Sequence, residues 1–175
     1  SNLPNDSNGT PAQMLELLLK AGLSPNDKRP DGMTAFMAVL RLHKLELAKA
    51  MIKHGADATA ESITEVGNIK VKSYPICAAA EFADTELMQM IRDQKPDINV
   101  SVETKALGVT MDSDYGGNVT WGGDGYTPLI IAIMSEHTDV AKMLLKAGAN
   151  VKIGSSGIAV LRSKAFFLHC LTEIS

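Results

Sequence analysis

Three similar segments, each an amphipathic helical pattern closed by a glycine, constrain this chain more than any other feature. The first two glycines, Gly22 and Gly55, are 33 residues apart, and Gly148 closes a third segment of the same design. A unit that recurs at a period of about 20–50 residues indicates a stacked repeat. Such stacks act through an extended surface more often than through a closed catalytic site.

The best-preserved unit begins at Thr127-Pro128. Threonine is a good helix N-cap because its hydroxyl accepts a hydrogen bond from a free amide of the first turn. Proline suits the next position, where no N–H is needed. We therefore predict a short buried helix up to residue 134, a second helix over 140–147 and a left-handed cap at Gly148.

The same unit is found twice more. The interval from Thr34 to Gly55 is 21 residues, as is the interval from Thr127 to Gly148. In a further unit Tyr74 replaces the capping threonine and Lys95 replaces the glycine, again 21 residues later.

This combination of turn, Thr-Pro-Leu, two helices and Gly-Ala-Asp/Asn resembles the ankyrin repeat. The matching pieces are Asp124–Leu129, Gly148–Asn150, Asp31–Thr34 and Gly55–Asp57. The resemblance implies an all-α ankyrin-repeat solenoid with three full repeats, a partial N-terminal repeat, a C-terminal capping helix and β-hairpin or loop insertions. The family's histidine after Thr-Pro-Leu is replaced by Met37, Cys77 and Ile130, so we expect less regular units.

We expect a single domain over residues 3–175. Its units would lie at about 3–28, 29–60, 72–99 and 122–152, with the cap at 155–175. The first unit would be half a repeat, because residues 3–9 do not suit a helix while Thr10–Gln13 starts one. The apolar positions of 158–174 suit one longer helix that covers the last repeat. Ser1 and Asn2 are interpreted as a vector remnant.

Two insertions, 61–71 and 100–121, lengthen the spacing between units. Gly67-Asn68 lies between alternating residues and predicts a β-hairpin. The second insertion is glycine-rich, suits a long hairpin or loop, and contains Tyr115 and Trp121. Loops on a rigid scaffold often carry binding, yet long loops cost little stability. A partner-contacting finger and a neutral elaboration both remain open.

Composition and motifs argue against most catalytic and metal chemistry. A net charge of -3 is unlike that of a phosphate-backbone binder, so no nucleic acid is expected. No apolar run reaches the ~18 residues of a membrane span. Cys77 and Cys170 have no metal-type spacing, and no zinc-protease motif, nucleophile elbow or P-loop is present. Asp112–Gly116 resembles the start of a calcium loop but lacks the later ligands, so a turn is favoured. We expect no enzyme, cofactor or metal.

The candidate partner-binding residues come from the ankyrin register, in which the concave face and finger tips contact partners. They form an apolar line with two finger aromatics: Met33, Leu42, Phe82, Tyr126, Met134, Tyr115 and Trp121. An exposed apolar patch with a charged rim would suit protein recognition. Alternatively, the insertions cover these residues. If the line is exposed, Phe82→Ala or Trp121→Ala weakens partner binding without unfolding the chain.

The sequence therefore predicts a monomeric, non-catalytic module that binds a protein partner. One alternative is a regulatory or targeting segment of a larger enzyme or of a secreted effector. Another is a small-molecule pocket between the long hairpin and the inner helices.

Overall fold

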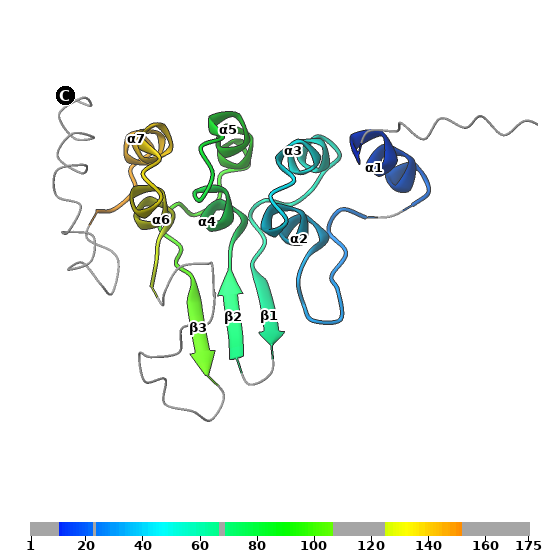
Figure 1. Ribbon diagram of the computed structural model, residues 1–175, viewed down its shortest axis with the longest axis horizontal. Coiled ribbons are helices and arrows are strands. Elements are labelled where there is room, and N and C mark those ends of the chain that lie inside the picture. The colour runs from blue at the N-terminus through cyan, green and yellow to red at the C-terminus, as the bar shows by residue number, and fades with distance from the viewer. Residues whose placement is uncertain (1–10, 23, 67–68, 107–124, 152–175) are drawn as a thin grey trace, which may run out of the picture.

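The computed structural model describes residues 11–22, 24–66, 69–106 and 125–151. In these ranges the chain is mostly helical, and seven helices are arranged in two layers (Figure 1). The helices are α1 (Pro11–Lys20), α2 (Ala35–Arg41), α3 (Leu45–Lys53), α4 (Pro75–Ala79), α5 (Thr85–Asp93), α6 (Pro128–Met134) and α7 (Thr138–Lys146). One layer contains α2, α4 and α6, and the other contains α3, α5 and α7 with α1 beside α3.

Consecutive helices form three pairs, α2 with α3, α4 with α5 and α6 with α7. The hydroxyl of Thr34 accepts from the Met37 amide at 3.1 Å, and that of Thr127 accepts from the Ile130 amide at 3.3 Å. Tyr74 occupies the same position before α4 but makes no side-chain cap. The helix pairs and both threonine caps predicted from the sequence are confirmed.

The glycines end the second helix of a pair in the left-handed conformation, which the sequence predicted for Gly148. Gly55 and Gly148 have φ angles of 88° and 89°. The Gly148 amide donates to the Leu145 carbonyl at 2.9 Å, and the Ala149 amide donates to the Leu144 carbonyl at 3.0 Å. These two bonds satisfy carbonyls that the helix end leaves unpaired.

The end of α5 departs from this arrangement. Lys95 has a φ angle of 57°, a conformation that is costly for a residue with a Cβ atom. Its amide donates to the Arg92 carbonyl at 2.8 Å. The next residue, Pro96, has no N–H and cannot donate the second bond that Ala149 donates after α7.

The core lies between the two helix layers and continues through all three helix pairs. Its largest fully buried side chains include Phe36, Met37, Leu40, Ile76, Leu87, Met88, Ile91, Ile133 and Leu144. Helices of 5–10 residues are too short to be stable alone in water. Each pair therefore depends on the apolar surface that its neighbours cover.

A nearly buried ammonium group joins the first helix pair, α2 with α3, to the second, α4 with α5. Lys49 on α3 lies 2.8 Å from Asp84, 2.8 Å from Glu86 and 3.1 Å from Glu46, and its side chain is only 10% exposed. Asp84 also accepts from the Leu87 amide at 2.9 Å, as the N-cap of α5. Burial opposes ionisation of Asp84, but the Leu87 amide and the Lys49 ammonium outweigh it and hold its pKa below the ordinary value.

Amide side chains connect the loops that follow the second helices. Each bonds a backbone N–H in the loop of an adjacent unit. Asn26 accepts from Asp57, Gln94 from Ala58 and Asn99 from Asn150, at 2.7, 2.8 and 2.8 Å. These bonds connect the loops of neighbouring units.

The insertions form one antiparallel sheet in the order β1 (Ser62–Val66), β2 (Ile69–Ser73) and β3 (Glu103–Ala106). Val66 pairs with Ile69, so β1 and β2 are antiparallel neighbours on either side of residues 67–68, where the sequence predicts a hairpin. The pairing of β3 with β2 was not predicted, and it joins the two insertions into one sheet. Tyr115 and Trp121, the segment at 158–174 and the Thr10 cap lie outside the described residues.

The sheet extends from the α2–α4–α6 layer, as Figure 1 shows. The turn at Gly32, before α2, lies directly against β1. Gly32 has a φ angle of 84°, and a Cβ atom there would collide with the Ile63 carbonyl. Glu65 on β1 pairs with Lys70 on β2 at 3.2 Å, and Glu61, just before β1, pairs with Lys72 on β2 at 3.1 Å.

We predict that Lys95→Gly raises the free energy of unfolding by about 0.5–1 kcal/mol. Glycine removes the left-handed penalty of ~1–2 kcal/mol, and the greater freedom of the unfolded chain offsets part of this gain. The matched change Gly148→Ala should lower stability by about 1 kcal/mol. Urea denaturation followed by circular dichroism measures both. An unchanged free energy of unfolding in Lys95→Gly would show that the backbone at Lys95 is unstrained.

We further predict that Lys49→Met lowers stability by about 1–3 kcal/mol, because carboxylates lose a nearly buried counter-ion. Lys70→Met, in the exposed pair with Glu65, should change stability by less than about 0.5 kcal/mol. The lowered pKa of Asp84 contributes stability above its unfolded value, near pH ~4, and this contribution is lost as the pH falls through the folded value. Denaturation at pH 7 and below pH 4 should therefore show a steeper acid loss in the wild type than in Lys49→Met; equal slopes would exclude this role of Lys49.

Candidate functional site

The candidate site is a ridge formed by the chain segments that end α2, α4 and α6. We use the name turn ridge for residues 41–44, 81–83 and 134–137. These segments lie at the carboxyl ends of their helices, whereas the β2 strand of the sheet leads into the amino end of α4. The ridge and the sheet therefore lie at opposite ends of that layer.

Contacts between neighbouring turns make the turn ridge continuous across all three helix pairs. The ring of His43 packs edge-on against Phe82, with 4.8 Å between ring centroids and an interplanar angle of 68°. Further along, His137 Nε2 lies 2.9 Å from the Glu81 carbonyl oxygen. The second, third and fourth units thus touch in order along the ridge.

Left-handed residues shape two of the three turns. His43 and Glu136 have φ angles of 56° and 59°. After α2, the His43 amide donates to the Leu40 carbonyl at 2.9 Å and the Lys44 amide donates to the Val39 carbonyl at 3.2 Å. This tight reversal ends α2 at a point where the preceding residue, Leu42, remains on the surface.

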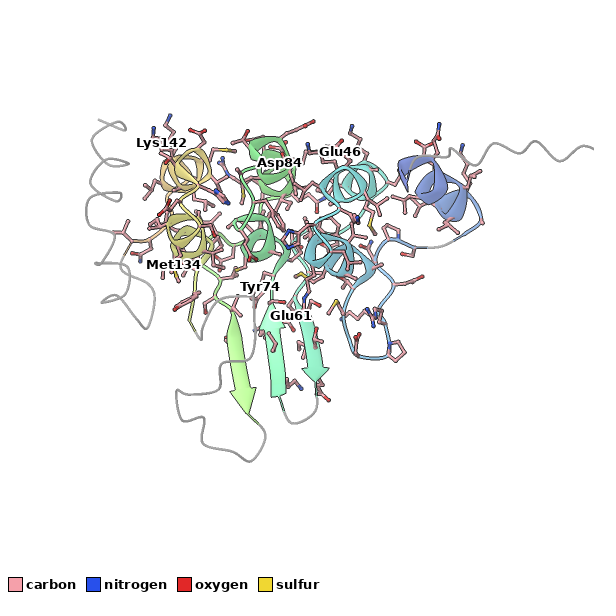
Figure 2. The ribbon with its side chains drawn as sticks, in the orientation of Figure 1. Glu46, Glu61, Tyr74, Asp84, Met134 and Lys142 are labelled. Carbon is pink, nitrogen blue, oxygen red and sulfur yellow. The ribbon has the colours of Figure 1, made fainter. Side chains whose placement is uncertain are left out.

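Three residues of the predicted apolar line belong to the turn ridge, and only two of them are exposed. Leu42 is 67% exposed and Met134 is 54% exposed, and Figure 2 labels Met134 at the end of α6. Phe82 and Met33 are both 7% exposed and lie in the interior. Tyr126 is partly buried and its carbonyl accepts from the Val102 amide at 3.0 Å, at the base of the sheet.

The expectation of surface side chains at Phe82 and Met33 is therefore wrong. At Phe82 the backbone differs from that at Leu42, because α4 ends early, at Ala79, and its last turn tightens. The Phe82 amide donates to Ala79, three residues back, whereas the Leu42 amide donates to Ala38, four residues back. A 3₁₀-type turn, with three residues per helical turn, rotates the next side chain away from the direction it would have in an α-helix. Phe82 therefore points inward and packs against His43.

Charged groups flank the exposed apolar residues. Arg41 and Lys44 are exposed beside Leu42, and Glu136 is exposed beside Met134. Glu81 is partly buried in the middle of the ridge. Burial raises the pKa of Glu81 above its ordinary value, and the nearby His43 and His137 oppose this shift.

The described residues contain little that suggests a catalytic or metal-binding site. No group of three or more His, Cys, Asp or Glu side chains within them is arranged to hold a metal ion. Cys77 is buried, and burial raises the pKa of its thiol, which disfavours a reactive thiolate. No helix in the described ranges has the length and apolar character needed to cross a membrane.

Sequence reasoning missed His43 and His137 as the side chains that connect the ridge. A signal was present, because each follows the first helix of a pair where the chain must reverse. Their partners, however, belong to the neighbouring unit, which local spacing does not identify.

Comparison with known proteins supports the resemblance at one unit. Residues 124–155 match the family model described as Ankyrin repeat, a range that contains α6 and α7. No curated protein matches the chain. Ankyrin repeats generally mediate protein–protein interactions and are typically non-catalytic.

We predict that Phe82→Ala lowers the free energy of unfolding by about 3 kcal/mol, because it leaves a cavity behind His43. Leu42→Ala, at an exposed position, should change stability by less than about 0.5 kcal/mol. Thermal and urea denaturation of the two variants measures the difference. Similar stabilities would contradict the assignment of Phe82 to the interior and would return it to the list of contact residues.

Proposed function

We propose that this chain is a non-catalytic protein-binding module built as an ankyrin-type solenoid. Its full repeats would be at about 29–60, 72–99 and 122–152, after a half repeat at 3–28 and before a cap at 155–175. The partner would lie along the turn ridge and the α2–α4–α6 layer, and the inserted sheet would add contacts.

One observation carries this proposal: two large apolar side chains are exposed at the ends of α2 and α6. Leu42 is the C-cap residue of α2 and Met134 is the last residue of α6. Burying one such side chain in an interface contributes about 1.5–3 kcal/mol. Scattered exposed apolar residues are normal on a protein surface, but these two lie on one continuous ridge.

The rigidity of the ridge supports a binding role. His43 is held against Phe82 and His137 against the Glu81 carbonyl, so neighbouring turns have fixed positions. A surface that is ordered before binding loses less conformational entropy when a partner docks. The exposed side chains would therefore act as anchors on a preformed surface.

The sheet is the second proposed contact. The ion pair Glu65–Lys70 joins β1 and β2, and the pair Glu61–Lys72 joins the residue before β1 to β2. Lys72 Nζ lies 5.5 Å from the centroid of the Tyr74 ring. Tyr115 and Trp121 of the second insertion remain proposed contacts of the same finger. The hypotheses of a regulatory or targeting segment and of a small-molecule pocket stay predictions, since no described feature tests them.

The test is affinity capture from an extract of the source organism with the wild-type chain and with Leu42→Ser/Met134→Ser. We expect the double variant to retain the fold and to capture at least about tenfold less partner, because it lacks the two side chains that the partner would bury. Leu17→Ser on α1 is the matched control, since Leu17 is 63% exposed and lies outside the ridge. Equal capture by the wild type and the double variant, measured by quantitative mass spectrometry, would exclude the ridge as the binding surface.

A further inference from the structure

A single carboxylate lies at the centre of the turn ridge, between its two exposed apolar side chains. Glu81 is seven residues after Tyr74 and Met134 is seven residues after Thr127, so they occupy equivalent positions in adjacent units. Leu42 lies one residue beyond the equivalent position of the preceding unit. A partner that contacts both apolar side chains therefore has to cross the Glu81 turn.

Both neighbouring units hold the Glu81 turn in place. His137 Nε2 lies 2.9 Å from the Glu81 carbonyl oxygen, and the imidazole donates this bond because a carbonyl oxygen only accepts. On the other side, His43 packs edge-on against Phe82, the residue that follows Glu81. The carboxylate is therefore carried by a turn with a fixed position on the ridge.

The Glu81 carboxylate is partly buried, yet within the described residues it has no ion-pair or hydrogen-bond partner. Burial raises its pKa above the ordinary value, and the charges of His43 and His137 oppose this shift only in part. A carboxylate that has lost some of its hydration is stabilised when a cation is placed beside it.

The basic side chains around the ridge do not supply this cation. The Lys49 ammonium lies 2.8 Å from Asp84, 2.8 Å from Glu86 and 3.1 Å from Glu46, so three carboxylates already share its charge. In the part of the chain that the structure describes, no ion pair joins Glu81 to the basic residues of the preceding turn. The centre of the ridge is therefore a site for a cation from outside the chain.

We propose that the partner contributes one arginine, which forms an ion pair with Glu81 between two apolar side chains that contact Leu42 and Met134. This inference rests on the proposed function of the turn ridge. Arginine fits better than lysine, because its planar guanidinium can donate two parallel hydrogen bonds to a carboxylate. It is also less strongly hydrated than an ammonium group, so it loses less when the site becomes covered.

The spacing of the units sets the spacing of the partner's residues. Neighbouring packed helices are about 8–10 Å apart, so each apolar contact would lie about that far from the carboxylate. An extended segment advances ~3.3 Å per residue, which places the arginine about two or three residues from an apolar residue on each side. The net charge of -3 would attract many basic proteins, whereas this spacing is specific to the ridge.

The first experiment selects ligands for the ridge. A phage-displayed library of random peptides, each of about 12 residues and thus longer than the ridge, is selected on the full 175-residue chain. Phage that also bind Leu42→Ser/Met134→Ser are removed, so the remaining peptides depend on the two apolar side chains. The expected consensus has an arginine between two apolar residues at the stated spacing.

A double-mutant cycle then tests the ion pair. The consensus peptide and a version with citrulline, which has the shape of arginine without its charge, are titrated by fluorescence anisotropy. On the wild-type chain, citrulline should weaken binding by about five- to thirtyfold, as expected for a partly buried pair. On Glu81→Gln the two peptides should differ by less than about twofold. Glu81→Met repeats the cycle if circular dichroism shows that the glutamine variant is misfolded.

Stability separates a binding role of Glu81 from a structural one. Because burial opposes ionisation of Glu81 in the folded chain, Glu81→Gln should unfold at the same temperature as the wild type or at a higher one. Glu136→Gln is the matched control, since Glu136 is an exposed glutamate of the same ridge. This control should change the affinity for the consensus peptide by less than about twofold.

The outcomes distinguish the arginine site from the binding ridge itself. Ridge-dependent peptides without a central arginine, or an equal citrulline effect on the wild type and on Glu81→Gln, would overturn the arginine site and leave the ridge intact. A loss of affinity in Glu136→Gln but not in Glu81→Gln would do the same. A selection that yields no peptide dependent on Leu42 and Met134 would overturn the proposed function and the arginine site together.

Discussion

The burial of short helices against their neighbours is the constraint on which the rest of the structure depends. The α4 helix has five residues and the others have seven to ten, so none is stable alone. Their apolar faces, represented by Leu40, Ile91 and Leu144, are buried completely only because adjacent units cover them. The stack is therefore a chain of nearest-neighbour interfaces, and any surface feature that crosses units inherits its geometry from them.

Polar contacts give this stack its register. The Lys49 ammonium joins α3 to α5, and amide side chains such as Asn26 and Asn99 join successive loops. The same principle operates on the turn ridge, where each histidine contacts the neighbouring unit. Because the ridge is assembled from three turns, its exposed anchors and their flanking charges keep a fixed order.

Much of the fold could be predicted from local pattern. The Thr34 and Thr127 caps, the left-handed Gly55 and Gly148 and the pairing of Val66 with Ile69 depend on a few consecutive residues, so the local sequence is enough to predict them. The candidate site was harder to predict. Leu42 and Phe82 occupy equivalent positions after Thr34 and Tyr74, yet one is exposed and the other is buried. The difference arises from the early, tight end of α4, which depends on packing and not on repeat register.

The sequence by itself determined the repeating helix pairs, their caps and the positions of the insertions, because these follow from backbone preferences and hydrophobic periodicity. Only the tertiary structure decided that β3 pairs with β2, that Phe82 lies against His43 and that Leu42 and Met134 remain on the surface of one ridge. Each of these depends on groups distant in sequence that meet when units stack, and the spacing within one unit does not contain that information.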